Sequence, residues 1–225
     1  MEKFIHKFGI FKNGFTLAEV LITLVIVGVV ASLTISAVIN TYVESSTVAK
    51  VKKGLSTVAQ AKKLAEAQNG SIECWNYGQD LTAETAAQFW SYLKPHFSIA
   101  KDCGSDESCY QSNGVYGLNG SLYSVNFNTR ADYYKFVLAD GSVMMFSTQG
   151  GRCSNQTHPI PNVCAVFLYD TNGDKKPNTV GKDIFVYLMD ANNVYPHEQN
   201  SCTKTSWGWG CSGYIIKHNN MKYLH

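Results

Sequence analysis

The segment NGFTLAEVLITLVIVGVVASLTISAVIN, residues 13–40, is an almost unbroken run of apolar side chains that contains a single carboxylate, Glu19. The segment from residue 15 to residue 39 is mostly apolar and about 25 residues long, which exceeds the roughly 20 residues that a helix needs to cross a bilayer. The segment therefore predicts a membrane-spanning helix. A carboxylate inside such a helix is costly unless it finds a partner, so the position of Glu19 needs an explanation.

The charges on either side of the apolar run indicate its orientation. Residues 1–14 carry three lysines and one acid, and no lysine or arginine follows the run until Lys50. Positive charge is retained on the cytoplasmic side of a membrane, so we expect the N-terminus inside the cell and the rest of the chain outside. A secretory signal peptide fits poorly, because its apolar core is roughly 7–15 residues long and its small cleavage residue follows that core. Here the small residue, Gly14, precedes the run.

The sequence KNG-FTLAEVLITLVIVGVVASL resembles the class III-type signal of type IV pilins and type II secretion pseudopilins. The resemblance covers about residues 1–40. It implies that a prepilin peptidase cleaves after Gly14 on the cytoplasmic side and that the new N-terminal residue, Phe15, is methylated. It also implies that Glu19 is the family's acid, five residues into the mature chain.

Cleavage gives Glu19 a physical role. The new α-amino group on Phe15 would lie about one helical turn from the carboxylate. In a helical filament the amine of one subunit can neutralise Glu19 of a neighbour, so the carboxylate favours assembly. Two other interpretations stay open: Glu19 reaches the membrane interface, or it pairs with the amine of its own chain.

The helical pattern continues beyond residue 40. Apolar residues recur there at helical spacing, with lysines on the other faces: Val48, Val51, Leu55, Val58 and Ala65. Asn69-Gly70 is a typical helix end. One helix over about residues 15–68 would be roughly 80 Å long, and a break near Asn40-Thr41 is the alternative.

We predict four segments along the chain: a leader peptide at 1–14, a transmembrane and assembly helix at 15–40, its amphipathic continuation at 41–70, and an extracytoplasmic globular head at 71–225. In the head, TAETAAQFWSYLK (82–94) predicts a short helix capped by Thr82 and limited by Pro95. Strands are predicted at 122–128, at 133–148 as a hairpin around Asp140-Gly141, at 163–170 and at 183–190. The closing segment WGWGCSGYIIKHNNMKYLH predicts a final strand or an exposed recognition edge.

The predicted fold class is therefore α+β, with a long N-terminal transmembrane helix packed on an antiparallel β-sheet head, which the resemblance also implies. All seven cysteines follow the apolar run, and none forms a CxxC pair. Disulfides persist outside the cytosol, which agrees with an extracytoplasmic head. Pairs close in sequence are candidates, although many other pairings remain open and Cys74 is a candidate free thiol: Cys103 with Cys109, Cys153 with Cys164, and Cys202 with Cys211.

One polar loop has the composition of a calcium site. Residues 170–183, DTNGDKKPNTVGKD, place oxygen-bearing side chains at offsets 0, 2, 4, 8 and 13, which suits the six to eight oxygen ligands of Ca²⁺: Asp170, Asn172, Asp174, Asn178 and Asp183. The loop is not an EF-hand, because its Gly173 stands two places before the sixth position, where an EF-hand has its glycine, and its twelfth position is Gly181 rather than a bidentate Glu. Major pseudopilins carry calcium in a loop of similar placement, so the resemblance implies the same ligand. An ordinary Asp/Asn/Gly-rich turn is the alternative.

Other classes of function find little support. The chain has no G-x-S-x-G, H-E-x-x-H or Walker A string, and its six histidines lack metal-ligand spacing and are expected on the surface or at caps. A net charge of +2 does not suggest a nucleic-acid partner.

We therefore predict a non-enzymatic structural subunit of a type II secretion pseudopilus or a type IV pilus, located in the bacterial inner membrane and assembled into a periplasmic or extracellular filament. Its expected partners are other pilin-like subunits, the prepilin peptidase, the inner-membrane assembly machinery and membrane lipid. The alternatives are a monomeric single-pass protein with a disulfide-rich ligand-binding head, and a competence-type pilin for DNA uptake.

Overall fold

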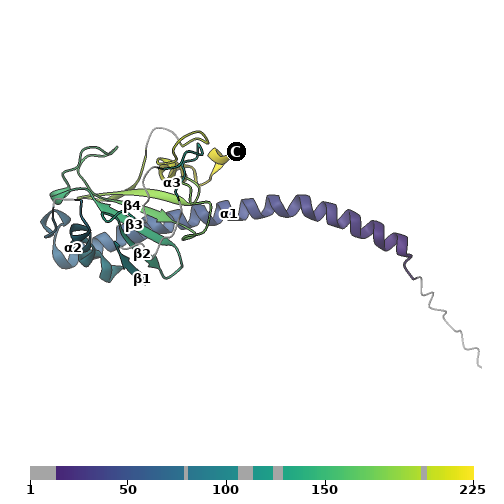
Figure 1. Cartoon of the computed structure of the whole chain (residues 1–225), viewed down its shortest axis with the longest axis horizontal. Helices are drawn as coiled ribbons and strands as arrows, with labels where there is room; N and C mark the ends of the chain where they lie inside the picture. Colours follow the sequence, from purple (N-terminus) through teal and green to yellow (C-terminus); the bar gives the residue numbers. More distant parts are fainter. Residues whose placement is uncertain (1–13, 79–80, 106–113, 124–128, 199–201) are drawn as a thin grey trace, which may run out of the picture. The chain divides into compact units, whose positions relative to one another are not determined.

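The structure is a computed structural model that describes residues 14–78, 81–105, 114–123, 129–198 and 202–225. It divides into two compact units, Met1–Val43 and Glu44–His225, which are described separately below. Helix α1 (Leu17–Asn69) runs without interruption through the boundary between them (Figure 1). The prediction of one helix is confirmed, and the alternative of a break near Asn40-Thr41 is excluded because both residues lie within α1. The helix ends at the predicted stop, where Gly70 adopts a positive φ of 79°.

The first unit contains the N-terminal part of α1. Its large apolar side chains are exposed along the whole segment, from Phe15 at 86 % to Val43 at 53 %. An 18-residue window of this helix has a mean hydropathy of 2.6, and none of that window is buried inside the molecule. Length and composition thus make α1 a candidate membrane span, as the sequence predicts.

The second unit, Glu44–His225, joins the predicted head at 71–225 to the C-terminal part of α1, and from here on the head means this whole unit. It is built on one six-stranded antiparallel sheet whose strand order follows the sequence. Its strands are β1 (Ile99–Gly104), β2 (Tyr134–Leu138), β3 (Val143–Thr148), β4 (Val163–Asp170), β5 (Ile184–Asp190) and β6 (Val194–Pro196). The head also contains α2 (Ala83–Leu93), α3 (Cys211–His218) and the short 3₁₀ helices η1 (Ile72–Cys74), η2 (Lys94–His96), η3 (Gly151–Cys153) and η4 (Lys222–Leu224).

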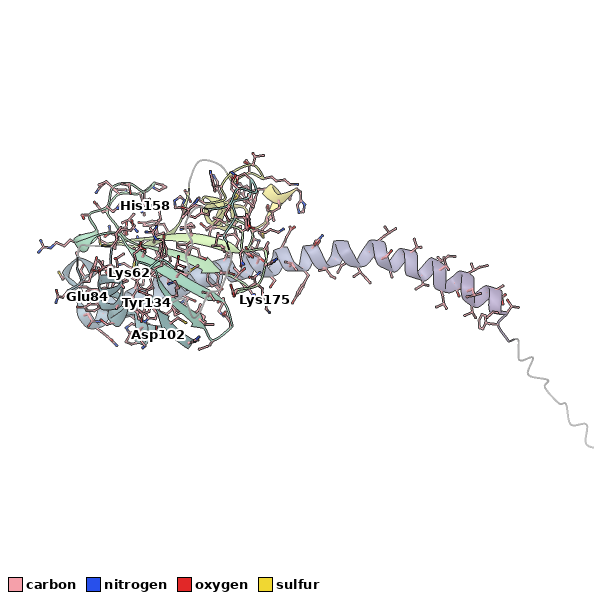
Figure 2. All side chains as sticks on the ribbon, in the orientation of Figure 1. Lys62, Glu84, Asp102, Tyr134, His158 and Lys175 are labelled. Atoms are coloured by element: carbon pink, nitrogen blue, oxygen red, sulfur yellow. A yellow bond between two sulfur atoms is a disulfide. The ribbon has the colours of Figure 1, made fainter. Side chains whose placement is uncertain are left out.

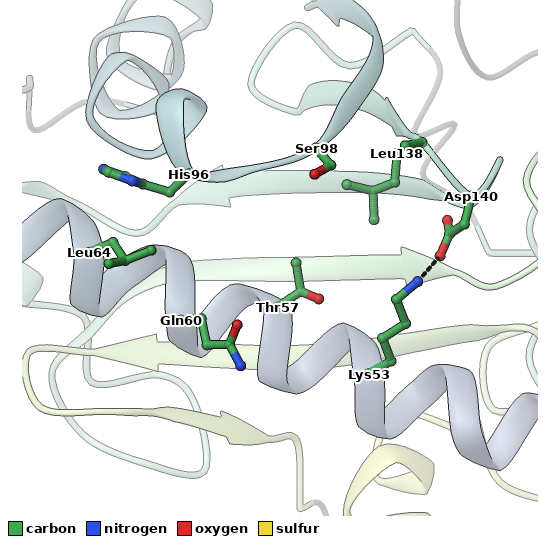
Figure 3. A pocket seen from close by; sticks show the side chains of 9 residues that line it. Lys53, Thr57, Gln60, Leu64, His96, Ser98, Leu138 and Asp140 are labelled. Atoms are coloured by element: carbon green, nitrogen blue, oxygen red, sulfur yellow. Dashed lines mark hydrogen bonds and ion pairs between the residues drawn. The ribbon is translucent and has the colours of Figure 1, made fainter.

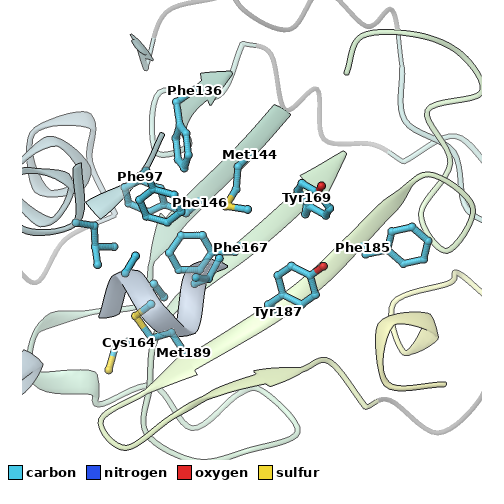
Figure 4. Packing of buried hydrophobic residues seen from close by; sticks show 14 of the residues in the cluster. Phe97, Phe136, Met144, Phe146, Cys164, Phe167, Tyr169, Phe185, Tyr187 and Met189 are labelled. Carbon is cyan, nitrogen blue, oxygen red and sulfur yellow. The ribbon is translucent and has the colours of Figure 1, made fainter. Parts of the chain in front are cut away.

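An aromatic layer joins the helices to one face of the sheet (Figure 4). The apolar stripe of α1 faces this layer: Val51, Val58 and Ala65 are fully buried. The Tyr187 hydroxyl of β5 donates a hydrogen bond to the Val51 carbonyl at 2.8 Å. Trp90 of α2 stacks on Phe136 of β2 with ring centroids 4.2 Å apart. Burial of these large side chains is the main stabilising contribution to the head.

A second apolar cluster covers the other face of the sheet, with loop residues such as Val115 and Val180 packed against the strands. Every residue of β4 is consequently buried. Such a strand appears in the sequence as a continuous apolar run rather than an alternating one. This is why the predictions at 163–170 and 183–190 are confirmed almost to the residue.

Several other predicted elements are confirmed. Strands β2 and β3 form the hairpin around Asp140-Gly141, and Gly141 supplies the positive φ of 82° that its turn requires. Helix α2 begins after Thr82, whose hydroxyl accepts the Thr85 N–H at 3.2 Å. The strand predicted at 122–128 lies mostly outside the described residues; Leu122 forms an isolated bridge with Tyr116.

Strands β1 and β6, at the edges of the sheet, are not predicted from the sequence. The prediction of a closing strand is wrong, because the segment forms helix α3. Tertiary contacts fix that helix: Cys211 is bonded to Cys202, and the Ser212 hydroxyl donates to the Val186 carbonyl of β5 at 2.6 Å. The aromatic and branched residues that favour a strand here instead pack into the core, as Ile215 and Tyr223 do.

Two charged or titratable residues are buried against expectation. Lys62 is 2 % exposed, although α1 lysines are expected on a solvated face. Its ammonium group donates to Glu66 Oε2 at 2.7 Å and to the Ala191 carbonyl at 2.9 Å. His197 is 4 % exposed rather than on the surface. Each residue is buried where a helix packs against the end of a strand: Lys62 of α1 contacts Ala191 after β5, and His197 after β6 contacts Ser212 of α3. Local sequence does not specify such contacts.

Candidate functional site

The predicted processing site lies immediately before helix α1. Gly14 and Phe15 are exposed and lie outside regular secondary structure. No atom lies within 4 Å of the position that a Cβ on Gly14 would occupy, apart from its chain neighbours. Within the described part of the chain, the Gly14–Phe15 peptide is therefore open to a peptidase.

Glu19 belongs to a capping box at the start of α1. Its carboxylate accepts hydrogen bonds from the Thr16 N–H and the Thr16 hydroxyl, both at 2.8 Å. The Thr16 hydroxyl oxygen in turn accepts the Glu19 N–H at 3.2 Å. The pattern Thr-x-x-Glu is the usual sequence of this motif, so residues 16–19 themselves carry the signal for the capping box.

In a single subunit, Glu19 therefore has hydrogen-bond donors, although its charge is not neutralised. Thr16 supplies neutral donors, which orient the carboxylate but do not neutralise its charge. None of the ion pairs among the described residues involves Glu19. The carboxylate is thus held next to Phe15, the residue whose α-amino group cleavage would expose, and it still lacks a counter-ion.

The loop between β4 and β5 is organised by Asp183. One carboxylate oxygen of Asp183 accepts the Thr179 N–H at 2.6 Å, and the other accepts the Asn178 N–H at 2.8 Å and the Asn172 side-chain amide at 3.2 Å. Asp170 Oδ1 accepts the Asn172 N–H at 3.1 Å. Burial raises the pKa of Asp183, and the hydrogen bonds from Thr179, Asn178 and Asn172 oppose that shift.

The five predicted calcium ligands differ in their surroundings. Asp170, Asn178 and Asp183 are buried, Asn172 is half-buried and Asp174 is exposed. Within the described residues, no three His, Cys, Asp or Glu side chains gather as a metal site. The Asn172 Oδ1 atom is buried and accepts no hydrogen bond from the described part of the chain, an arrangement that has a free-energy cost unless another group supplies a positive partner.

Comparison with protein families adds a direct finding on the N-terminus. Residues 11–35 match the family model described as the prokaryotic N-terminal methylation motif. This match to the N-terminal segment supports an assignment to the type IV pilin-like proteins. Its long exposed apolar helix and six-stranded antiparallel sheet fit the α+β fold of such proteins. No curated protein and no solved structure matches the chain.

The disulfides of the chain stabilise its head locally. Cys153 bonds Cys164 and Cys202 bonds Cys211, as predicted, across 11 and 9 positions of sequence. Cys103 is also disulfide-bonded, whereas its predicted partner, Cys109, lies outside the described residues. Cys74 is a free, exposed thiol.

A small groove of about 280 Å³ lies between α1 and the segment that leads into β1 (Figure 3). An ion pair closes one end, with Lys53 Nζ 2.8 Å from Asp140 Oδ2. Burial raises the pKa of Asp140, but Lys53 and the hydrogen bonds from Ser142 outweigh it and lower the value to about 2. The ion pair holds the β2–β3 turn against the helix, and this structural role accounts for the charged lining of the groove.

Proposed function

We propose that this chain is a structural subunit of a type II secretion pseudopilus or a type IV pilus, which polymerises through its N-terminal helix and supports secretion or pilus function without catalysis of its own. The observation that carries the proposal is the methylation motif at residues 11–35. The motif overlaps the first part of helix α1, whose large apolar side chains are exposed as far as Val43. Such a surface needs lipid or other helices to cover it.

The proposed sequence of events follows from the chemistry of the N-terminus. The chain enters the bacterial inner membrane with its N-terminus in the cytoplasm and its head outside, as the lysines of residues 1–14 favour. A prepilin peptidase cleaves after Gly14, and the new amine on Phe15 is methylated. The amine of one subunit then neutralises Glu19 of its neighbour, while the inner-membrane assembly machinery moves the helix from lipid into a periplasmic or extracellular filament.

Mass spectrometry of the membrane fraction tests the first step. We expect a mature chain that begins at N-methyl-Phe15, and Gly14→Ala should retain the leader. Recovery of Met1 on the wild-type chain, together with no helix-to-helix cross-links, would support the monomeric alternative instead.

Substitution at Glu19 tests the assembly step. Glu19→Leu should insert into the membrane normally but co-assemble poorly with wild-type subunits, because it brings no carboxylate to a neighbour's amine. Thr16→Ala is the matched control, since it removes the capping hydroxyl and keeps the charge. Normal incorporation of Glu19→Leu into filaments would contradict the proposed role of the carboxylate.

We also propose that the 170–183 loop binds Ca²⁺. The buried, unsatisfied Asn172 Oδ1 beside the carboxylates of Asp170 and Asp183 favours this proposal. Asp174 and Asn178 would complete an oxygen-rich set, which suits Ca²⁺ in a flexible loop. Bound calcium would stabilise the folded head and reduce the entropy cost of ordering a long polar loop.

Thermal unfolding of the full chain in detergent tests the calcium proposal. Calcium at 100 times its Kd should add about 2.7 kcal/mol of stability, and equal magnesium should add much less. Asp170→Asn should abolish the calcium effect. Asp190→Asn is the matched control, because Asp190 accepts two backbone N–H groups in a turn outside this loop. An unchanged melting temperature with calcium would exclude the site.

A further inference from the structure

Half of the lysines and arginines of the head lie in three short segments. Residues 44–53, 170–183 and 217–225 together contain eight lysines and four acidic residues. The rest of residues 44–225 contains eight lysines and arginines and eleven acidic residues. Positive charge is therefore concentrated in the three segments, whereas the remainder of the head carries a net negative charge.

Two contacts place these segments at the first residues of the head. His225 Nε2 lies 2.8 Å from Glu44 Oε1, so the C-terminal segment ends beside the residue with which the head begins. Lys50 Nζ donates to the Thr171 carbonyl at 2.8 Å, which joins the same part of α1 to the 170–183 loop.

Two further contacts hold the segments together. Lys52 Nζ donates to Asn219 Oδ1 at 2.8 Å, and the Tyr223 hydroxyl donates to the Gly181 carbonyl at 2.7 Å. The three segments therefore form one surface, which we call the basic end. Its exposed lysines are Lys52, Lys175, Lys176, Lys182, Lys217 and Lys222.

The acids of the basic end offset only part of this charge. Asp170 and Asp183 are buried, Glu44 is paired with His225, and Asp174 is exposed. Even with the α-carboxylate of residue 225 counted, exposed lysines outnumber the negative groups that meet solvent. Figure 2 shows Lys175 at one end of the head and Glu84, in the first turn of α2, at the other.

The position of the basic end along the chain suggests its partner. Glu44 directly follows Val43, with which the exposed apolar side chains of the candidate membrane span end. Tyr42, 73 % exposed, is of the amphipathic aromatic type that is enriched at membrane interfaces. From Glu44 to Lys52, α1 rises about 12 Å, whereas the whole head part of α1, to Asn69, rises about 38 Å.

These lengths decide which lysines sense a charged membrane. Salt screens electrostatic attraction over about 8–10 Å. The contacts that anchor the basic end lie within about 12 Å of Glu44 along the helix, and lysine side chains extend beyond the backbone that carries them. Charges near Asn69 lie several screening lengths away.

We propose that the basic end binds the anionic headgroups of phospholipids in the leaflet from which α1 emerges. The inference rests on the membrane location in the proposed function and adds a site on the head to the apolar contact of the helix. Each lysine near an anionic surface strengthens binding several-fold. The contact exists while the span is in lipid and has to be broken when the helix enters a filament.

Free phosphate and nucleic acid are other anions that a lysine-rich surface attracts. The membrane span favours lipid, because it holds the basic end close to headgroups at a high effective concentration. No comparable tether brings the soluble anions to this surface.

Chemical labelling of individual lysines tests the proposal. The full chain is reconstituted into vesicles of phosphatidylcholine, with or without phosphatidylglycerol, and treated with a membrane-impermeant reagent that acylates amines. Mass spectrometry then gives the rate at each lysine. We expect phosphatidylglycerol to slow acylation by about threefold or more at the basic end, and high salt to remove this protection; the lysines that report it are Lys175, Lys176, Lys182, Lys217 and Lys222.

Lys63 is a control within the same molecule. It is exposed, and it lies about 28 Å along α1 from Glu44, so its acylation rate should be equal in the two kinds of vesicle. Equal rates at the basic end in the two kinds of vesicle, or equal protection of Lys63, would overturn the proposal.

Charge reversal tests whether the surface acts as a unit. Lys175→Glu/Lys176→Glu should raise the acylation of Lys217 and Lys222 in phosphatidylglycerol vesicles by about twofold or more, because the neighbouring loop no longer attracts the headgroups. The matched control Lys63→Glu should leave their protection unchanged. Protection that survives the double reversal would contradict a shared lipid site.

Soluble anions separate the remaining explanations. Inorganic phosphate or a DNA oligonucleotide, added to phosphatidylcholine vesicles, should protect the basic end much less than phosphatidylglycerol does; equal protection would overturn lipid as the partner. None of these results depends on filaments, so their failure leaves the filament function standing. A chain that is protected as expected but retains Met1 and never pellets as filaments would overturn the filament function and leave the lipid site in place.

Discussion

Removal of the charge on Glu66 is the sharpest test of how α1 is held on the head. The Lys62 ammonium group is buried, with a side chain 2 % exposed, and its only acidic partner among the described residues is Glu66, 23 % exposed and 2.7 Å away. Glu66→Gln removes the counter-charge but keeps an oxygen to accept the Ile72 N–H, which Glu66 Oε1 now accepts at 3.2 Å. The substitution therefore isolates the electrostatic contribution.

The expected magnitude lies between two limits. Breaking a fully buried pair costs about 3–5 kcal/mol, whereas an exposed pair contributes about 0–1 kcal/mol. With one partner buried and the other partly exposed, we expect Glu66→Gln to cost about 2 kcal/mol. For a domain of this size that corresponds to a fall of about 4–8 °C in melting temperature.

The double variant provides the control. Lys62→Met/Glu66→Gln removes both charges and fills the same space with an apolar chain, so its stability should return to within about 1 kcal/mol of the wild type. Thermal unfolding of the full chain in detergent, followed by near-UV circular dichroism, measures all variants. If Glu66→Gln melts within about 1 °C of the wild type, or if the double variant is the least stable, the described role of this pair is wrong.

Two further predictions concern the core. Burial lowers the pKa of His197 to about 4, and the charge of His158 acts in the same direction. Because the unfolded chain binds a proton at this histidine below about pH 6.5 and the folded head does not, the free energy of unfolding should fall by about 2–3 kcal/mol as the pH falls from 6.5 toward 4. Melting temperatures from pH 7.5 to 4.5 should show a shallower decline in His197→Phe, and equal slopes would contradict the assignment. A Cβ on Gly54 would lie 2.8 Å from the Tyr169 ring and 2.9 Å from the Tyr187 hydroxyl. Gly54→Val should therefore destabilise the head by about 1–3 kcal/mol. Gly28→Val is the control: a Cβ there has no atom within 4 Å, so the melting temperature of the head should not change.

The elements that the sequence predicted well are those whose chemistry is local. Thr82 caps α2 with its own hydroxyl, and Asp140-Gly141 turns a hairpin because glycine tolerates a positive φ. The apolar runs of β4 and β5 are typical of strands buried on both faces. The disulfides between Cys153 and Cys164 and between Cys202 and Cys211 are also close in sequence.

The elements that could not be predicted from the sequence depend on contacts with distant parts of the chain. Strand β1 is an exposed edge with two register shifts, so its residues do not alternate. Helix α3 is only eight residues long and relies on Ser212 and a disulfide rather than on helix propensity. The burial of Lys62 follows from a carbonyl at Ala191, 129 residues away.

At the N-terminus, the sequence predicted the site but not the local geometry around Glu19. The Thr16–Glu19 capping box shows that the carboxylate is oriented before any neighbour arrives. A counter-ion supplied by a second subunit therefore finds the acceptor already fixed, which reduces the entropy lost on pairing.

The simple strand order of the head has a consequence for biogenesis. Each strand pairs with the strand that follows it in sequence, and the two described disulfides close intervals of 11 and 9 residues. A sheet with this nearest-neighbour connectivity gains its pairings one hairpin at a time, with little loop-closure entropy lost at each step. The chain can therefore build its head progressively, strand by strand, and close these disulfides as the strands pair, in a compartment where disulfides persist.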